Sequence, residues 1–381
     1  MKSLIETRTQ RTERAFLIGV ELKSRPGGGT TRETLEELAE LSKSAGATVV
    51  GEGTQKMDVP HPGTFLGKGK AEEFAAWCKE HQVDTVIFDE ELSPAQSRNL
   101  EKIFNCKVLD RTALILDIFS MRARTREGKL QIEMAQLQHL LPRLTRFWGH
   151  LSRQRGGIGM RGGEGESQLE SDRRRVQERI DKIRADLEIV RRQRSTQRLA
   201  RQRNQWPLAS IVGYTNAGKS TLLNALTGAA VLAEDKLFAT LDPTTRRLRL
   251  PTNQNVLLTD TVGFIRKLPH SLVESFKATL EEVVQADLLL HVVDASHPQA
   301  DAHVEAVNAV LREIGAEGKP TLMVFNKADQ LRANHQLARF MERHPTGVAV
   351  SAITGEGIPE LLAELGAALR PVREFLELAI P

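Results

Sequence analysis

Short apolar runs and amphipathic segments alternate through the first part of the chain. The runs at residues 16–20, 48–51, 85–88 and 107–109 are apolar enough to form buried strands. Apolar positions with helical spacing lie between them, at residues 31–44, 70–80 and 94–104. Strands that alternate with helices are typical of a parallel sheet covered by helices. We therefore expect a small parallel α/β domain over residues 1–129.

The next region, residues 130–204, has two stripes of apolar residues at alternating spacings of four and three. The first stripe consists of Leu130, Met134, Leu137, Leu141, Leu144, Trp148 and Leu151, and the second of Val176, Ile180, Ile183, Leu187 and Val190. Two such stripes predict an antiparallel helical hairpin that buries one seam. Pro142 should kink or divide the first helix. The glycine-rich connection at residues 155–165 either becomes ordered against a partner or acts as a flexible linker.

From residue 205 onwards, apolar runs are followed by short polar segments. The runs, at residues 208–212, 256–259, 321–325 and 348–350, predict further buried strands. We expect a second α/β domain over residues 205–368, with a polar segment after each of these strands. The tail, residues 369–381, is either a docking segment or a frayed end.

The first polar segment has the pattern G-x-x-x-x-G-K-[ST], which binds phosphate groups. It consists of Gly213, Tyr214, Thr215, Asn216, Ala217, Gly218, Lys219 and Ser220, and Thr221 follows it in a segment of helix-forming residues. The glycines let backbone N–H groups turn toward phosphates, and the helix N-terminus adds its positive end. Lys219 can reach the β- and γ-phosphates, and the Ser220 hydroxyl can complete a Mg²⁺ shell.

Further polar segments indicate that the base of the nucleotide is guanine. They are Asp260, Thr261, Val262 and Gly263, then Asn326, Lys327, Ala328 and Asp329, and finally Ser351, Ala352 and Ile353. In the first, D-x-x-G, the Asp260 carboxylate is placed to hold Mg²⁺ through water and the Gly263 N–H to sense the γ-phosphate. The Asp329 carboxylate can accept from both N1–H and the exocyclic amine of guanine, and the backbone of the last segment can contact the guanine carbonyl oxygen. Such polar pairing rejects adenine, because mispaired groups stay unsatisfied. Asn326 should tie its loop to the phosphate loop.

A GTPase also needs a threonine whose hydroxyl meets Mg²⁺ and whose N–H contacts the γ-phosphate. The segment between the phosphate loop and the D-x-x-G motif contains Phe238, Ala239, Thr240, Leu241, Asp242, Pro243, Thr244 and Thr245. We favour Thr240 for this role and keep Thr244 and Thr245 as alternatives, because a polar cluster around Pro243 is equally typical of an ordinary turn.

Phe264 follows Gly263, at the position where a glutamine usually orients the attacking water. A phenylalanine cannot hydrogen-bond to that water, so intrinsic hydrolysis should be slow unless the water is held otherwise. Asn216 offers one route, because its amide oxygen can help hold a monovalent cation such as K⁺ beside the phosphates. The alternative is that Asn216 only closes the loop by local hydrogen bonding.

The charge of the chain is concentrated in one region. The formal net charge is only +4, yet residues 143–204 hold 17 Lys and Arg against 8 Asp and Glu. This segment favours a polyanion such as RNA, because the arginines that dominate it suit phosphate and stacked-base contacts; the alternative is a solvated basic face. The sequence has neither an N-terminal apolar signal segment nor a run of about twenty apolar residues. We expect a soluble, cytoplasmic protein without a membrane span, and a monomer.

Together with the GTP-binding motifs, two longer segments resemble the HflX family of translational GTPases. They are Gly-Gly-Ile-Gly-Met-Arg-Gly-Gly-Glu-Gly-Glu at residues 156–166 and Phe-Ala-Thr-Leu-Asp-Pro-Thr at residues 238–244. The resemblance covers nearly the whole chain in domain order, and the phenylalanine after Gly263 fits it. The expected fold is α/β, with a P-loop GTPase domain preceded by a small parallel α/β domain and an antiparallel helical hairpin.

The resemblance also implies an activity and partners. The chain would hydrolyse GTP to GDP and phosphate, slowly unless the ribosome stimulates it. It would bind the large ribosomal subunit and its ribosomal RNA, and split or rescue stalled ribosomes under stress such as heat. By position, Lys219, Thr240 and Gly263 would act in catalysis, Ser220 and Thr240 would hold Mg²⁺, and residues 238–242 would join the phosphate and guanine segments around the nucleotide. Two other functions stay open: a GTPase of ribosome assembly or RNA modification, and a scaffold that binds GTP as a structural ligand.

Overall fold

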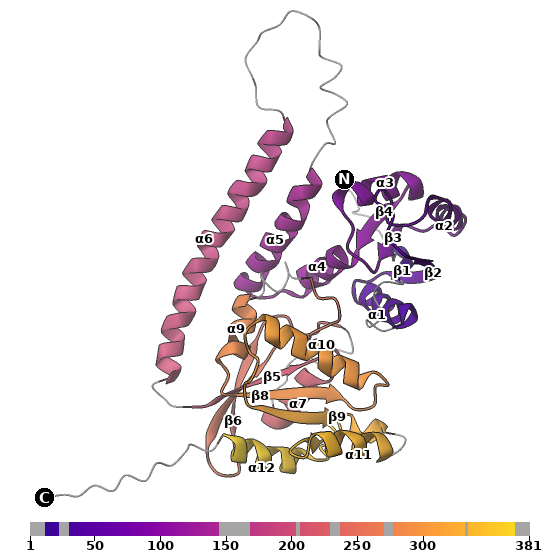
Figure 1. Cartoon of the computed structure of the whole chain (residues 1–381). Coiled ribbons are helices and arrows are strands. Elements are labelled where there is room, and N and C mark those ends of the chain that lie inside the picture. Colours follow the sequence, from indigo (N-terminus) through magenta and orange to yellow (C-terminus); the bar gives the residue numbers. More distant parts are fainter. Residues whose placement is uncertain are drawn as a thin grey trace, which may run out of the picture. The chain divides into compact units, whose positions relative to one another are not determined.

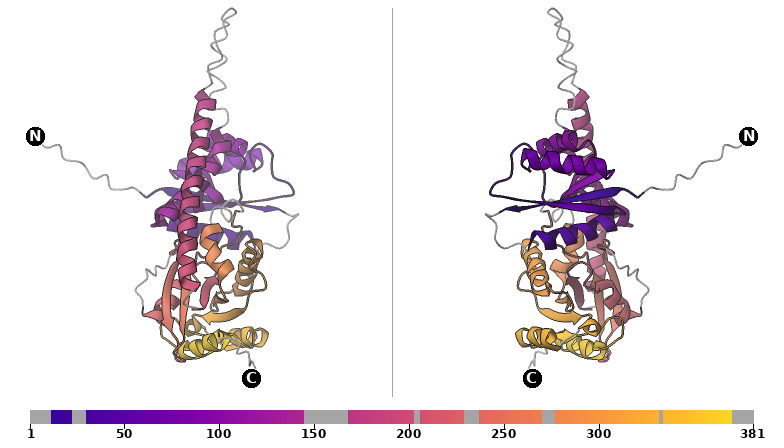
Figure 2. Two further views of the ribbon diagram at one scale, coloured as in Figure 1. Left: turned by 90° about the vertical axis from the view of Figure 1, so that its left-hand side faces the viewer. Right: turned by 90° about the vertical axis from the view of Figure 1, so that its right-hand side faces the viewer.

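The computed structural model describes residues 12–22, 30–144, 168–202, 206–228, 237–269, 277–331 and 334–369. The chain divides into two compact units, which Figure 1 and Figure 2 show from three sides. The first unit contains residues 1–121 and 132–184, and the second contains residues 122–131 and 185–381. None of the described helices combines the length and the apolar composition that crossing a bilayer requires.

A four-stranded parallel sheet with the order β2-β1-β3-β4 is the centre of the first unit. The elements are β1 (Arg14–Leu22), α1 (Thr31–Ser44), β2 (Thr48–Met57), α2 (Lys68–Glu80), β3 (Thr85–Phe88), α3 (Pro94–Phe104), β4 (Lys107–Asp110) and α4 (Arg111–Arg122). The predicted strands and helices are all present, and the sheet is parallel as expected. Capping boxes begin two of the helices, at Thr30 for α1 and at Ser93 for α3. Phe16, Phe74 and Phe88 lie in the core that the helices cover.

The first unit also contains most of the predicted hairpin, formed by α5 (Arg126–Leu140) and α6 (Gln168–Gln202). The two helices contact each other through a bidentate ion pair in which Arg179 donates to Glu133 at 2.7 and 2.9 Å. On α6 the predicted stripe is confirmed for Ile180, Ile183 and Leu187, which are buried, whereas its outer members Val176 and Val190 are half-buried.

On α5 the predicted stripe is wrong in part. Leu130, Met134 and Leu137 are only half-buried, whereas Ile132 and Ala135 are the buried apolar residues of this helix. The buried face of α5 is therefore turned relative to the heptad pattern. The expected break at Pro142 is confirmed, since α5 ends at Leu140 and a 3-10 helix, η1 (Leu141–Leu144), follows. Trp148, Leu151 and the glycine-rich segment lie outside the described residues.

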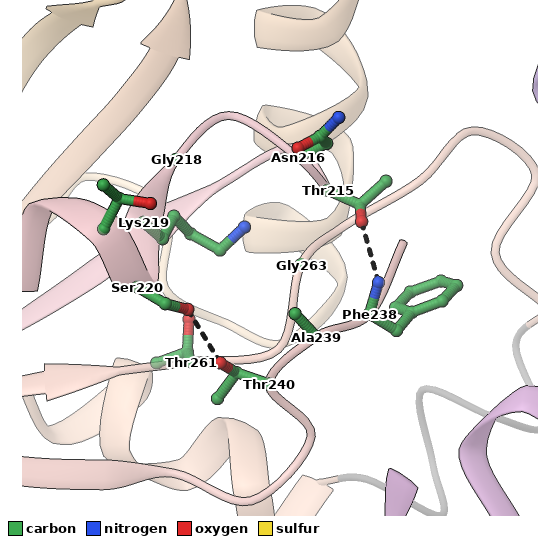
Figure 3. Close-up of a pocket in the computed structure, with 11 residues that line it drawn as sticks. Thr215, Asn216, Gly218, Lys219, Ser220, Phe238, Ala239, Thr240, Thr261 and Gly263 are labelled. Atoms are coloured by element: carbon green, nitrogen blue, oxygen red, sulfur yellow. Dashed lines mark hydrogen bonds between the residues drawn. The ribbon is translucent and has the colours of Figure 1, made fainter. Parts of the chain in front are cut away.

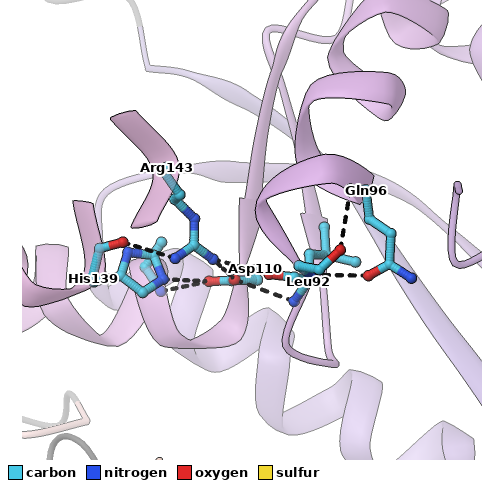
Figure 4. A network of polar contacts seen from close by, with 7 residues as sticks. Leu92, Gln96, Asp110, His139 and Arg143 are labelled. Carbon is cyan, nitrogen blue, oxygen red and sulfur yellow. Dashed lines mark hydrogen bonds and ion pairs between the residues drawn. The ribbon is translucent and has the colours of Figure 1, made fainter. Parts of the chain in front are cut away.

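A buried carboxylate, Asp110, ties the end of α5 to the sheet of the first unit (Figure 4). Arg143 donates to Asp110 at 2.7 Å and to the Leu92 carbonyl at 3.0 Å, and His139 Nε2 lies 3.6 Å from the same carboxylate. Burial by itself raises the pKa of Asp110, but His139, the Ala113 N–H and Arg143 outweigh it and hold the pKa below its ordinary value. Arg143, the first residue of the basic segment, is thus used within the fold.

The second unit is built on a six-stranded sheet with the order β10-β9-β8-β5-β7-β6. Its strands are β5 (Leu208–Gly213), β6 (Thr244–Arg249), β7 (Asn255–Asp260), β8 (Leu288–Asp294), β9 (Thr321–Asn326) and β10 (Val348–Ala349). Its helices are α7 (Lys219–Thr227), α9 (Lys277–Gln285), α10 (Ala300–Glu313), η3 (Ala328–Gln330), α11 (Asn334–Arg343) and α12 (Ile358–Ala368). The four predicted apolar runs are confirmed as β5, β7, β9 and β10. All strands are parallel except β6, which pairs with β7 in the antiparallel sense.

This sheet brings the predicted polar segments to one edge. Ile211, Leu258, Leu290 and Val324 are fully buried in one apolar cluster and fix the central strands. Because β5, β7, β9 and β10 run in the same direction, the segments that follow them meet at the carboxyl edge of the sheet, where open α/β sheets bind their ligands.

Candidate nucleotide-binding site

A pocket opens beyond the ends of β5 and β7 (Figure 3). The residues that line it are Thr215, Asn216, Gly218, Lys219, Ser220, Thr221, Phe238, Ala239, Thr240, Thr261 and Gly263. Every one of these residues belongs to the segments in which the sequence predicted nucleotide contacts. The structure therefore brings the phosphate loop, the Thr240 segment and the D-x-x-G segment around one cavity.

The phosphate loop depends on the glycines at the first and sixth positions of its motif. Gly218 has the left-handed value φ +88°, and a Cβ there would lie 2.3 Å from Asn326 Nδ2. A Cβ on Gly213 would lie 2.2 Å from the Val292 carbonyl oxygen. The loop can therefore turn close to β8 and β9 and deliver the N-terminus of α7, which begins at Lys219, to the pocket.

Lys219 is held inside the loop that it serves. Its Nζ donates to the carbonyl oxygens of Gly213, at 3.2 Å, and Tyr214, at 2.8 Å, and the side chain is buried. Burial lowers the pKa of Lys219 to about 8, against the opposing effect of Asp260. An ammonium group in this setting gains strongly from an anion, so phosphate oxygens are its natural ligand.

Three oxygen-bearing side chains meet beside Lys219 in an arrangement suited to a divalent cation. The Ser220 hydroxyl donates to Asp260 Oδ2 at 2.6 Å, and the hydroxyls of Ser220 and Thr240 are 2.8 Å apart. Asp260 is fully buried, and its Oδ1 has no hydrogen-bond partner in the structure as described. Burial raises the pKa of Asp260, while Lys219, Ser220 and Thr240 act against this rise. Hydroxyl and carboxylate oxygens are the donors that Mg²⁺ prefers, so these residues fit that ion.

The structure distinguishes Thr240 from its two alternatives. Thr244 and Thr245 lie in β6, and the Thr245 hydroxyl pairs across the strands with that of Thr259 at 2.9 Å. Neither lines the pocket, whereas Thr240 does. The Thr240 segment is also held at Phe238, whose N–H donates to Thr215 Oγ1 at 3.1 Å (Figure 3).

Asn326 joins the guanine-side segments to the phosphate loop, as the sequence predicted. Its Nδ2 donates to the Ala217 carbonyl at 2.9 Å, and its Oδ1 accepts from the Ala352 N–H at 3.0 Å. Lys327 forms an ion pair with Asp294 at 2.7 Å, which places its stem along this edge. Asp329 is exposed, and Ile353 is 73% exposed. Both are therefore accessible to a base.

Phe264 does not face the nucleotide pocket. Its side chain is fully buried, its N–H donates to the Gly213 carbonyl at 3.1 Å, and its carbonyl accepts from Thr215 N–H at 2.7 Å. The residue thus fixes the D-x-x-G segment to the phosphate loop as part of the core. Among the described residues, those that line the pocket include no glutamine, histidine or carboxylate.

The remaining predicted residues do not line the pocket. They are Gly213, Tyr214, Ala217, Leu241, Asp242, Asp260, Val262, Asn326, Lys327, Ala328, Asp329, Ser351, Ala352 and Ile353. Tyr214 points toward α10, where its ring stacks on His303 with 3.8 Å between ring centroids. Burial lowers the pKa of His303 to about 3, so this histidine is a neutral packing partner. Sequence reasoning missed His303 and Asp294, because neither belongs to a motif.

Comparison with known proteins covers the chain from one end to the other. Family models described as "GTP-binding GTPase N-terminal", "GTP-binding GTPase Middle Region" and "50S ribosome-binding GTPase" match residues 32–120, 122–201 and 209–327. The chain is 49% identical to the GTPase HflX of Magnetococcus marinus over 378 residues, which cover 99% of this chain and 87% of that protein. It is 53% identical to the GTPase HflX of Escherichia coli (strain K12) over 334 residues, which cover 87% and 78%.

A solved structure has the same fold. The crystal structure of the complex of SsGBP and GDP is similar with a TM-score of 0.52 and 26% identity, over 93% of this chain and 98% of that one. Three observations point to the same family. They are the nucleotide motifs, the pocket that these motifs line, and relatives that are about 50% identical over most of the chain. The chain therefore belongs to the HflX family of GTPases, enzymes that hydrolyse GTP.

Proposed function

We propose that this GTPase binds the large ribosomal subunit and splits or rescues stalled ribosomes under stress, with GTP as its conformational switch. The match of residues 209–327 to a model described as a 50S ribosome-binding GTPase supports the partner. The observation that carries the switch is the contact among Ser220, Thr240 and Asp260, because it joins three separate segments at one point. In this role the protein acts in the cytoplasm as a monomer.

The switch requires groups that distinguish GTP from GDP. Ser220 and Thr240 would hold Mg²⁺ directly and Asp260 through water, and bound Mg²⁺ would neutralise charge on the β- and γ-phosphates. Lys219 would bind the same phosphates, and the Gly263 N–H would contact the γ-phosphate. A ligand shifts a conformational equilibrium only as far as it binds one state more tightly than the other. Binding of the GTP-bound protein to the ribosome would therefore drive splitting, and hydrolysis of GTP would return the protein to its starting state.

Slow intrinsic hydrolysis is expected because Phe264 takes the position of the usual glutamine, and its buried ring cannot hydrogen-bond to the attacking water. We propose that Asn216, exposed at the pocket with φ +61°, helps to hold K⁺ beside the phosphates. GTP turnover should then be faster in K⁺ than in Na⁺, and the Asn216→Ala variant should lose the difference. Equal rates of the unchanged protein in both salts would contradict this role.

The exposed face of α6 is the proposed contact with ribosomal RNA. Arg173, Arg174 and Arg175 are exposed, and the pairs of Arg174 with Glu178 (3.6 Å) and Arg175 with Asp172 (3.7 Å) are long and solvent-accessible. Ion pairs of this kind are weak, so phosphates can replace them. Phosphate contacts make binding fall steeply with salt concentration.

Sedimentation through a gradient tests the proposal. Ribosomes should separate into subunits with GTP or a non-hydrolysable analogue but not with GDP, and the protein should travel with mature large subunits. Replacing Arg173, Arg174 and Arg175 by Gln should weaken this association and its salt dependence. The same change at Arg339 and Arg343, which pair with Asp301 on the second unit, is the matched control.

Two outcomes would favour other functions. Association with precursor particles or free RNA rather than mature subunits would indicate a GTPase of assembly or RNA modification. If ribosomes do not stimulate GTP turnover and binding does not depend on salt concentration, the protein would instead be a scaffold.

A further inference from the structure

The carboxylate of Asp242 is bound at the beginning of α5. Its Oδ2 accepts from the backbone N–H groups of Arg124, at 2.8 Å, and Thr125, at 2.9 Å, and its Oδ1 accepts from the Thr125 hydroxyl. Thr125 is also the cap of α5, because its Oγ1 accepts from the Gly128 N–H at 3.0 Å. All of these residues belong to the second unit.

This contact adds a third attachment to two that lie in the part of the Thr240 segment before β6. Phe238 donates to Thr215, Thr240 meets Ser220, and Asp242 is held by α5. The first two attachments end on the phosphate loop, within reach of the nucleotide. The third ends on a helix that lines no part of the pocket. A carboxylate with three donors at a helix N-terminus forms charge-assisted hydrogen bonds, which are stronger than neutral ones.

We infer that Asp242 is a positioning residue for GTP hydrolysis, which holds Thr240 in place by anchoring its segment to Arg124 and Thr125 at the N-terminus of α5. The inference rests on the proposed role of Thr240 as a Mg²⁺ ligand. Only one residue separates Thr240 from Asp242, so displacement of one moves the other. Coupling between two sites is reciprocal. Binding of Mg²⁺ and GTP at Thr240 therefore stabilises the contact at Thr125, and anything that stabilises the first turn of α5 favours the hydrolytic arrangement.

The anchor lies on a helix whose residues are divided between the two units. α5 begins in the second unit, and its residues from Ile132 onward belong to the first. The Asp242 contact thus lies at the N-terminus of a helix that itself forms one arm of the hairpin.

Gly128 supplies an independent way to disturb the anchor. A Cβ at this position would lie 2.5 Å from Asp242 Oδ1 and 3.2 Å from Thr125 Oγ1, so Gly128→Ala must displace the carboxylate. Alanine nevertheless favours the helix more than glycine does. Gly69 is the matched control, because it lies in the first turn of α2 and a Cβ there meets nothing within 4 Å.

The test uses the full chain without ribosomes, so its result does not depend on the proposed partner. In Asp242→Ala we expect kcat to fall and the Mg²⁺ concentration for half-maximal turnover to rise, each about tenfold, because charge-assisted bonds are lost. The affinity for GDP should stay within about twofold, since GDP does not need the Thr240 segment. Asp242→Asn should lie between, because its amide oxygen still accepts. Gly128→Ala should follow Asp242→Ala, and Gly69→Ala should behave as the unchanged protein.

Hydrogen exchange supplies a readout that a purely structural role would not move. The amides of Arg124 and Thr125 should exchange more slowly with Mg²⁺ and a non-hydrolysable GTP analogue than with GDP, and Asp242→Ala should remove this difference. The inference is overturned if the Asp242 and Gly128 variants match Gly69→Ala. It is also overturned if they weaken binding of GDP and of the analogue equally.

The Thr240→Val variant separates this inference from the proposal on which it rests. If Thr240→Val raises the Mg²⁺ requirement and Asp242→Ala does not, only the positioning role fails. If Thr240→Val leaves the Mg²⁺ requirement unchanged, the metal assignment and the positioning role both fail.

Discussion

The Asn326→Ala variant should destabilise the second unit and weaken nucleotide binding together. Asn326 is 2% exposed, and its amide joins the Ala217 carbonyl to the Ala352 N–H. Ala217 is 1% exposed and Ala352 is 9% exposed. Water therefore cannot readily replace the two lost hydrogen bonds, and both backbone groups remain buried without a partner.

The magnitude follows from those two orphaned groups. Leaving one buried donor or acceptor unsatisfied costs about 1–3 kcal/mol, so two cost about 2–6 kcal/mol. Since the Ala352 N–H lies nearer the surface, we expect a loss of about 3 kcal/mol in the free energy of unfolding. If the two loops separate without global unfolding, the same free energy appears in binding, as a loss of about 100-fold in GDP affinity.

Urea denaturation of the nucleotide-free protein and GDP titration measure the two quantities. Asn308→Ala, at an exposed position of α10, is the matched control and should change stability by no more than about 0.5 kcal/mol. Asn326→Asp should lie between, because its carboxylate still accepts from the Ala352 N–H but cannot donate to the Ala217 carbonyl. If Asn326→Ala unfolds with the control and binds GDP as tightly, the assignment of Asn326 as the link between the loops is wrong.

Three further outcomes are expected. Nucleotide binding should take up a proton between pH 8 and 9 and weaken as the pH rises above 8, because the pKa of Lys219 is lowered to about 8 and bound phosphates raise it again. Calorimetry in two buffers of different ionisation enthalpy measures this proton uptake. A binding reaction without proton uptake at pH 8.5 would contradict the lowered pKa. Asp329→Asn should shift the nucleotide preference from GTP toward xanthosine triphosphate, because the amide donates where the carboxylate accepted. Competition binding measures the two affinities, and an unchanged affinity for GTP would refute the contact between Asp329 and the base. Thr240→Val should raise the Mg²⁺ concentration that turnover requires. Thr245→Val should leave this requirement unchanged and lower the free energy of unfolding by about 1 kcal/mol, because Thr245 pairs with Thr259. Equal effects of the two variants on turnover would refute the assignment of Thr240 rather than Thr245 to Mg²⁺.

The motifs could be predicted because each depends on a short stretch of sequence. A buried strand requires a run of apolar residues, and a phosphate loop requires glycine where φ is positive, as at Gly218. The strands at β5, β7 and β9 and the loops that follow them therefore appear in the sequence itself. All residues that line the pocket came from these stretches and from the Thr240 segment.

Some expectations failed because burial on a helix depends on its neighbours. The heptad pattern on α5 predicted Leu130, Met134 and Leu137 as the buried stripe, but Ile132 and Ala135 are the buried apolar residues. Several apolar positions on this helix fit more than one face. The packing of α5 against its neighbours determines which of these faces is buried.

The sequence by itself determined the four strands of the first sheet, the strands β5, β7, β9 and β10 of the second, the nucleotide motifs and the family, because local composition and spacing are sufficient for each. Only the tertiary structure decided which of the three threonines contacts Ser220. Thr240 does so, whereas Thr244 and Thr245 lie in β6 and pair with β7. It also decided that Asp242 binds Thr125, the cap of α5, although the two residues are 117 positions apart in the sequence. Contacts between segments so far apart arise from packing, and no local pattern encodes them.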